Sequence, residues 1–217
     1  MTDQKIFKYP GKEIDVFWDK RLCIHIGECG NSEGELFIGG RQPWCKPDVV
    51  DVEEVIDVVK RCPTGALTYK LRDGGSEEIP ESNNQVRVAH RGPLYITGAL
   101  EIENLPDEMA GANFRVALCR CGASVNKPFC DNNHENIGFN DYGAVGNRGP
   151  GLAEVGGALE IRAIEDGPLM LKGNFNIQAG SGREAWSGTG TALCRCGASK
   201  RKPFCDGSHK EIEFKST

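Results

Sequence analysis

The N-terminal third of the chain changes between the apolar spacing of strands and that of a helix. Two short apolar runs, Ile6–Tyr9 and Ile14–Trp18, flank a Pro-Gly pair, which predicts two strands joined by a turn. Within residues 52–61, three valines and an isoleucine recur at i, i+3, i+4 and i+7. This spacing is typical of an amphipathic helix, with Asp51 as its N-cap. A third strand is expected through residues 69–71.

A polar segment separates this region from a second one that is rich in short strands. Residues 72–85 contain a Gly-Gly pair, two adjacent glutamates and two adjacent asparagines, which is typical of a linker. We therefore predict one domain over residues 1–72 and a β-rich domain over residues 86–217. Strands of the second domain are expected at residues 86–88, 94–98, 115–118 and 158–161.

The second region contains one sequence pattern twice. Gly92-Pro93-Leu94 recurs at residues 167–169, 75 positions later, Ala117-Leu118 recurs at residues 192–193, and Phe139 recurs as Phe214. A constant offset without gaps indicates two copies of one module. We expect the copies to pack as a pseudo-dimer within one chain, and the protein to be a monomer.

Composition limits the class of protein. Hydrophobic residues make up 39% of the 217 residues, below the usual ~45–50%, and there are 28 glycines. This combination predicts turn-rich β structure with modest cores, to which bound metal would add folding free energy. The net charge of −5 argues against a nucleic acid partner, and it would match a basic protein.

Cysteine usage indicates a reducing compartment. Ten cysteines occur in a chain whose N-terminus, Met1–Lys5, lacks the apolar region of a secretion signal. No stretch of sequence approaches the ~20 apolar residues of a membrane-spanning helix. We expect a cytoplasmic protein that does not contact a membrane.

Each copy of the repeat carries the pattern Cys-x-Cys-x8-Cys-x3-His, at residues 119–134 and 194–209. The first two cysteines can share one metal ion, and the third cysteine and the histidine can share another. This pairing suits a two-iron, two-sulfide cluster, whereas one structural zinc suits the same Cys3His set, and disulfides or free thiols are a third hypothesis. The candidate ligands are Cys119, Cys121, Cys130 and His134 in the first loop, and Cys194, Cys196, Cys205 and His209 in the second.

The second loop carries Cys194, Cys196, Ser199, Pro203, Cys205, Asp206, Gly207, Ser208 and His209. In these positions it resembles the CDGSH iron–sulfur proteins. The first loop keeps all four ligands but departs at Asn132 and Asn133, where the family has Gly and a small residue. The resemblance implies one [2Fe–2S] cluster per loop, with Cys-x-Cys on one iron and Cys plus His on the other. Because imidazole replaces an anionic thiolate, the reduction potential should exceed that of an all-Cys cluster.

Three cysteines of the N-terminal domain, Cys23, Cys29 and Cys62, form a Cys-x5-Cys pair followed by a distant Cys-Pro. Residues 14–71 thereby resemble monocluster ferredoxins of the divergent kind that is fused to CDGSH modules. Ordinary [4Fe–4S] ferredoxins have another cysteine where this chain has Ile26, so three ligands suit a [3Fe–4S] cluster.

Two further residues complicate this site. Cys45 is either a fourth ligand, which would give [4Fe–4S], or an ordinary buried thiol. His25 is another candidate ligand or else a solvated loop residue. The alternative for the three cysteines is that they are ordinary thiols of the protein core.

These patterns together predict an α+β protein. A small ferredoxin-like N-terminal domain is followed by a β-rich, pseudo-twofold tandem CDGSH module with cluster-binding loops and short helices. The sequence contains no recognisable catalytic set, so we expect a carrier and not an enzyme. The expected function is electron transfer to a redox partner protein. The alternatives are storage of clusters for delivery to an apo iron–sulfur acceptor, and a zinc-stabilised interaction module.

Overall fold

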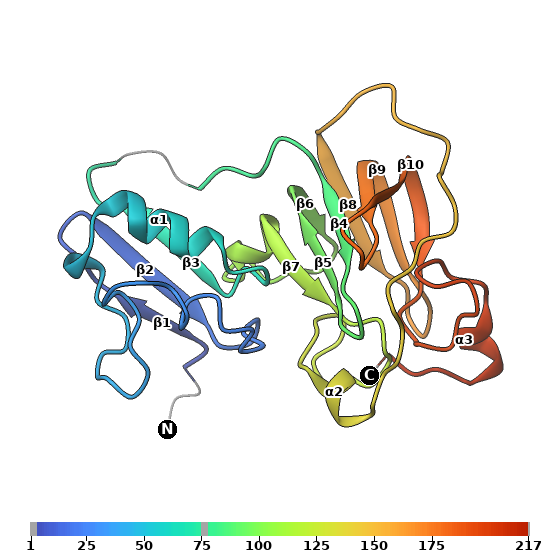
Figure 1. Ribbon diagram of the computed structural model, residues 1–217, viewed down its shortest axis with the longest axis horizontal. Coiled ribbons are helices and arrows are strands. Elements are labelled where there is room, and N and C mark those ends of the chain that lie inside the picture. Colours follow the sequence, from blue (N-terminus) through green and yellow to red (C-terminus); the bar gives the residue numbers. More distant parts are fainter. Residues whose placement is uncertain (1–3, 75–77, 217) are drawn as a thin grey trace.

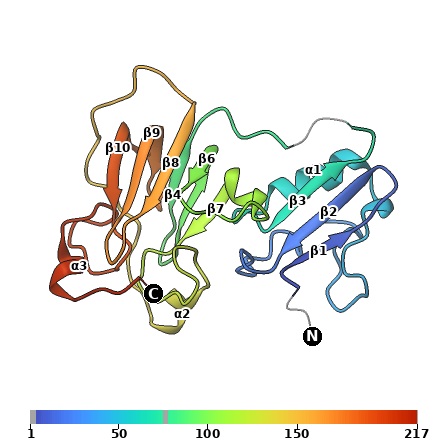
Figure 2. The ribbon, with the colours of Figure 1, turned by 180° about the vertical axis from the view of Figure 1, so that it is seen from behind.

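The computed structural model describes residues 4–74 and 78–216. These residues form two sheets that lie side by side, and residues in strands outnumber those in helices (Figure 1). The same arrangement is seen from behind in Figure 2. None of the helices in the described ranges is both long and apolar enough to cross a membrane.

The first sheet has three antiparallel strands in the order β1-β2-β3, namely Ile6–Tyr9, Ile14–Asp19 and Leu67–Leu71. Helix α1, Val52–Lys60, packs on this sheet through Val55, Val58 and Val59, which are buried. The predicted strands and helix are thus confirmed. Asp51 occupies the N-cap position, but its side chain makes no capping hydrogen bond.

The second sheet has seven strands in the order β6-β8-β9-β4-β5-β7, with β10 paired to β9. The strands are β4 (Gln85–Val88), β5 (Leu94–Thr97), β6 (Ala99–Ile102), β7 (Arg115–Leu118), β8 (Ala158–Ala163), β9 (Leu169–Gln178) and β10 (Glu184–Leu193). Short helices α2 (Asn133–Asn136) and α3 (Ser208–Glu211) lie at one end of this sheet (Figure 1).

The strand registers repeat with the offset found in the sequence. Gln85 pairs with Thr97 between β4 and β5, and Glu160 pairs with Lys172 between β8 and β9, 75 residues later in both strands. Likewise, Leu94 pairs with Leu118, and Leu169 pairs with Leu193. The predicted internal repeat is therefore confirmed at the level of hydrogen-bonded pairs.

The two copies also exchange strands. β6 of the first copy runs parallel to β8 of the second, with Glu101 opposite Glu160, and the far half of β9 runs parallel to β4, with Asn176 opposite Gln85. The apolar side chains on these strands, among them Leu100 and Leu159, are buried in one shared core. Each copy therefore completes the sheet of the other.

Part of the segment expected to be a linker, residues 78–85, packs into the fold. Residues 75–77 lie outside the described residues, but Glu78 and Asn84 are both buried. The Asn84 amide donates to the carbonyl oxygens of Gly157 and Asn174, and its Oδ1 accepts from the Ala99 amide. Asn84 thus satisfies backbone groups where the two copies exchange strands, so this part of the segment is structural.

Candidate metal centres

In the first loop, residues 119–134, strand β7 leads directly into Cys119. The Sγ atoms of Cys119 and Cys121 lie 3.7 Å apart, and Cys130 Sγ lies 3.4 Å from His134 Nδ1. The Cys119 amide donates to the Pro128 carbonyl and the Cys130 amide to the Ala117 carbonyl, each at 2.9 Å. These bonds fold the loop back so that both ligand pairs stand at the end of the sheet.

The second loop, residues 194–209, repeats this geometry. Cys194 Sγ and Cys196 Sγ lie 3.8 Å apart, and Cys205 Sγ lies 3.4 Å from His209 Nδ1. The structure thus brings together the predicted residues of each loop as two pairs.

The pair distances fit metal coordination. Two thiolates bonded to one metal at about 2.3 Å with tetrahedral angles would be about 3.8 Å apart, and a thiolate and an imidazole about 3.6 Å apart. Every pair is close to these values, so each can hold one metal ion. Among the residues the structure describes, no three Cys, His, Asp or Glu side chains converge on a single metal position. Each loop therefore presents its four ligands as two pairs.

A serine and an aspartate brace each loop. Ser199 Oγ donates to the Phe204 carbonyl at 2.7 Å and accepts the Arg201 amide at 3.0 Å. Asp206 accepts the amides of Lys200 and Ser208, and also the Ser208 hydroxyl, which holds the pKa of that carboxyl well below its usual range. Ser124 and Asp131 make the corresponding bonds in the first loop.

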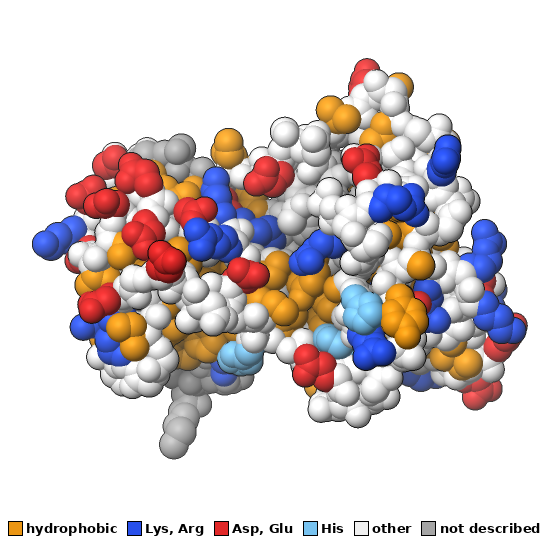
Figure 3. Space-filling view, viewed as in Figure 1, with side chains coloured by type: hydrophobic (Ala, Val, Ile, Leu, Met, Phe, Trp, Pro, Cys, Tyr) orange, Lys and Arg blue, Asp and Glu red, His pale blue; other side chains and the backbone are white. Residues whose placement is uncertain are grey.

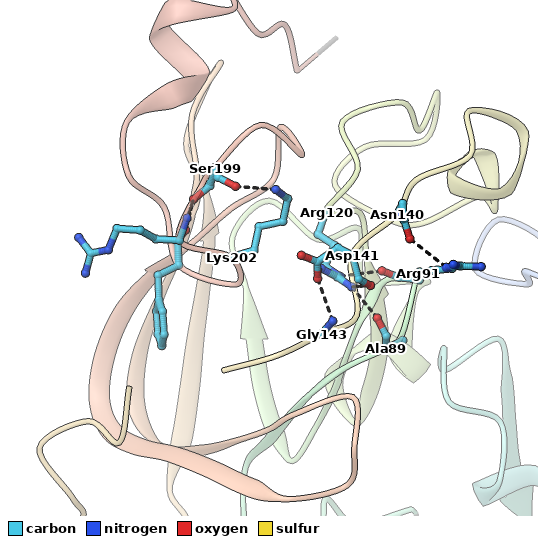
Figure 4. A network of polar contacts seen from close by, with 11 residues as sticks. Ala89, Arg91, Arg120, Asn140, Asp141, Gly143, Ser199 and Lys202 are labelled. Carbon is cyan, nitrogen blue, oxygen red and sulfur yellow. Dashed lines mark hydrogen bonds and ion pairs between the residues drawn. The ribbon is translucent and has the colours of Figure 1, made fainter. Parts of the chain in front are cut away.

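Two buried arginines beside the ligands were missed by the sequence analysis. Arg120, between the first two cysteines, donates to the carbonyls of Gly92 at 2.7 Å and Ala89 at 2.5 Å and pairs with Asp141 (Figure 4). Arg195 repeats the carbonyl contacts with Gly167 and Ile164. The sequence did contain a signal, because the residue between the two cysteines of Cys-x-Cys is arginine in both copies. The Arg195 guanidinium lies close enough to Cys119 and Cys196 for their charges to interact, and that of Arg120 lies close enough to act on His134.

Burial affects the thiols of the first loop. It raises the pKa of Cys130 to about 12. The hydrogen bond from Cys121 lowers the pKa of Cys119 to about 6, while the pKa of Cys121 is raised because the two sulfurs share one proton. Metal binding requires thiolates, so filling this loop must release protons.

The two loops touch beside their ligands. A Cβ on Gly122 would lie 2.6 Å from the carbonyl oxygen of Cys196, and a Cβ on Gly197 would lie 2.6 Å from that of Cys121. Both glycines also have φ values of +84° and +81°. Glycine is thus required at both positions for steric reasons, and the contact joins the two centres.

The N-terminal cysteines Cys23, Cys29 and Cys62 line one cavity of about 610 Å³, together with aromatic side chains of the first sheet. His25 lines the same cavity, with Nδ1 3.9 Å from Cys23 Sγ. Cys45 is not among the lining residues. It is buried in the apolar core, and burial raises its pKa to about 12. The structure therefore groups three of the four cysteines around the cavity, whereas Cys45 lies outside its lining but close enough to Cys29 for their charges to interact.

The N-terminal cavity and the first loop are held together by side-chain contacts. Asn126 Nδ2 donates to the Arg21 carbonyl at 2.8 Å, and Asn132 Nδ2 donates to the Ile24 carbonyl at 2.5 Å. Ile24 packs against Cys130 in a small buried cluster. Asn132 is one of the two departures from the motif, and its φ of 66° keeps the left-handed turn that Gly207 makes in the second loop.

A buried arginine strengthens the same junction. Arg115 Nε donates to the carbonyl of Cys62 at 2.9 Å, and Nη2 donates to that of Leu67 at 3.1 Å. Its remaining nitrogen pairs with Glu78, which is also buried. The backbone of Cys62 is therefore fixed by the strand that leads into the first loop.

Comparison with known proteins places these centres in two families. Residues 9–72 match the family model of the divergent 4Fe-4S mono-cluster, and residues 91–135 and 166–210 each match the iron-binding zinc finger of CDGSH type. Over 62 residues, 29% of this chain and 82% of the relative, the chain is 45% identical to the uncharacterized protein YjdI of Escherichia coli strain K12. YjdI of Escherichia coli O157:H7 gives the same figures. No solved structure matches.

The matched regions define a protein with iron–sulfur binding domains. The chain belongs to the divergent 4Fe-4S mono-cluster family in its N-terminal part and carries two CDGSH-type iron-binding domains after it.

Proposed function

We propose that this protein is an electron carrier with a [2Fe–2S] cluster in each CDGSH loop and a third cluster in the N-terminal cavity. The observation that carries the proposal is the pairing of ligands in both loops. Cys119 and Cys121 would bind one iron and Cys130 and His134 the other, and the second loop would use Cys194, Cys196, Cys205 and His209 in the same way. A single zinc ion would require all four side chains to converge, and the pairs favour two irons.

The N-terminal region is proposed to be a ferredoxin-like domain with Cys23, Cys29 and Cys62 as ligands. Cys45 does not line the cavity, which favours three cysteine ligands, and three ligands suit [3Fe–4S]. A [4Fe–4S] cluster would need a fourth ligand, and His25 also lines the cavity. The bound clusters would supply one-electron redox chemistry, while the chain orients them and limits their contact with water.

Electron transfer is favoured because the three centres are joined in a row. The contact between Asn132 and Ile24 connects the N-terminal cavity with the first loop. The contact between Gly122 and Cys196 connects the first loop with the second. Tunnelling rates fall steeply with distance, so short connections through bonds and hydrogen bonds suit a relay. The carrier is proposed to act as a cytoplasmic monomer, with its pseudo-dimer formed inside one chain, and no catalytic reaction is proposed.

Delivery of a cluster to an apo-acceptor is a second candidate function. It is favoured by the partly exposed positions of Cys205 and His209, which would let an acceptor reach the second cluster. Reversible reduction without loss of iron would support the carrier. Transfer of iron and sulfide to an apo-protein would support delivery.

Metal analysis of anaerobically purified protein tests the proposal. We expect about seven iron per chain with a [3Fe–4S] cluster or about eight with [4Fe–4S], counting two for each CDGSH loop. EPR spectroscopy of the isolated and reduced protein would distinguish the two. About four iron would leave only the paired centres, and zinc in place of iron would refute the carrier in favour of an interaction module.

A further inference from the structure

We infer that the second CDGSH loop is the docking site for an acidic redox protein. This inference rests on the proposed function, because it assigns a partner to one of the proposed clusters. The net charge of the whole chain predicted a basic partner. The inference is the opposite, because the charge around the second loop differs in sign from that of the whole chain.

The two loops differ in what covers them. Asn126, Asn132 and Ile24 join the first loop to the N-terminal region, and Cys130 and His134 are buried, with exposed fractions of 4% and 8%. In the second loop, Cys205 and His209 are partly exposed, although in the Cys-x-Cys pairs Cys196 is buried and Cys121 of the first loop is partly exposed. Electron exchange with another protein through the Cys-His side of a centre is therefore easier at the second loop.

The charges around the loops differ in the same direction. Residues 194–216 contain six basic and three acidic residues, a net charge of +3, whereas the matched residues 119–141 contain two basic and three acidic residues, a net charge of −1. The whole chain has a net charge of −5. Figure 3 shows acidic side chains crowded over α1 at the left, with lysines and arginines more frequent toward the right margin.

Three exposed residues, Lys200, Arg201 and Lys210, form what we call the basic rim. Their matched positions in the first loop are Val125, Asn126 and Glu135. None of the ion pairs found in the described part of the chain involves the rim. The acidic neighbours of the rim are Asp206, which is engaged within the loop, Glu211 at the end of α3, and Glu213 just after α3, the last two being exposed.

Charge compensation for the cluster does not explain the rim. Both loops have the same ligand set, and the buried Arg120 and Arg195 stand at the same position in each. The first loop has no basic residue at any of the three rim positions. The additional charge is therefore available for a partner, and carboxylates on a protein surface are its complement.

The proposed step moves one electron from the reduced partner to the oxidised [2Fe–2S] cluster of the second loop. One iron goes from Fe³⁺ to Fe²⁺ while the partner is oxidised by one electron, and no bond forms or breaks. The reverse direction uses the same site.

The test uses an acidic plant-type [2Fe–2S] ferredoxin, whose potential of about −400 mV makes it a reductant. The variant Lys200→Val/Arg201→Asn/Lys210→Glu gives the second loop the residues of the first. The control Lys12→Val/Lys46→Asn/Lys60→Glu makes the same change in charge at exposed sites of the N-terminal region. Visible spectra confirm that the fully loaded proteins have equal cluster content.

Two quantities are measured with each protein: the affinity for oxidised ferredoxin and the rate constant for electron transfer from reduced ferredoxin. At low salt, we expect the rim variant to lose at least tenfold in both, and the control less than about twofold, with all proteins converging at high salt because steering is screened. Electron transfer that is insensitive to the rim overturns the inference but leaves the carrier standing. Rim-dependent binding without electron transfer supports docking and contradicts the carrier. Rim-dependent binding of duplex DNA, with no binding of ferredoxin, overturns the acidic protein as partner.

Discussion

The hydrogen bond from Asn132 to the Ile24 carbonyl should hold the N-terminal cysteine loop against the first CDGSH loop. Asn132→Gly removes this bond while keeping the left-handed turn, because Gly adopts a φ of 66° without strain. An intramolecular hydrogen bond contributes about 1 kcal/mol, which corresponds to a factor of about five in an equilibrium. Asn132→Ala adds the cost of a Cβ in this conformation, roughly 1 kcal/mol more, so we expect about 2 kcal/mol in total.

Hydrogen exchange in the cluster-loaded protein measures this effect locally. Amides of residues 22–30 should exchange about five times faster in Asn132→Gly than in the wild type, and the strands of the second sheet should be unchanged. Gly207→Ala is the matched control, because Gly207 has a φ of 93° and no side chain to bond with. It should destabilise the second loop without affecting residues 22–30. Equal exchange of residues 22–30 in Asn132→Gly and the wild type would show that Asn132 does not hold the loop.

Three further outcomes follow from contacts described above. Arg115→Met should lower the free energy of unfolding by about 3–5 kcal/mol, because it leaves Glu78 buried and unpaired. In denaturant titrations, the double variant with Glu78→Met should recover much of this loss. No recovery would contradict the ion-pair explanation. Gly197→Ala should push the two CDGSH loops apart, since its Cβ would lie 2.6 Å from the Cys121 carbonyl oxygen. EPR of the fully reduced protein should then show weaker magnetic coupling between their clusters, and unchanged coupling would refute this. His209→Cys should keep its visible cluster absorbance at lower pH than the wild type, because acid protonates imidazole in competition with the metal, and equal loss rates would exclude His209 as the acid-sensitive ligand.

Local patterns predicted most elements of the fold. The valine spacing located α1, and the constant offset of the repeat located matched registers in the second sheet. The strand exchange between copies was beyond this reasoning, because parallel pairs such as β6 with β8 join residues far apart in the sequence. Glu78 and Asn84 were assigned to a linker for the same reason. Their polar side chains bond to groups far away in the sequence, which the local composition does not reveal.

The candidate ligands were predictable because each CDGSH loop holds its own set within sixteen residues. The N-terminal cavity depends on the fold, and only the structure shows that Cys23, Cys29 and Cys62 line it while Cys45 does not. The difference at Asn132 looked like a defect in the motif. It becomes intelligible once the side chain is seen to bond with a loop that lies more than a hundred residues away in the sequence.

Strand exchange has a consequence for how the two halves can vary. When two identical chains form a symmetric pair, every substitution appears on both sides, so a residue that suits one neighbour is imposed on the other as well. Here the halves are interlocked through β6 with β8 and β4 with β9, yet each is encoded separately. Asn132 can therefore bond to the N-terminal region from the first loop, while Gly207 at the matched position of the second loop has no side chain to make such a bond. Neither residue constrains the other. Interlocking within one chain also makes the pairing independent of protein concentration, so this division of roles persists at any dilution.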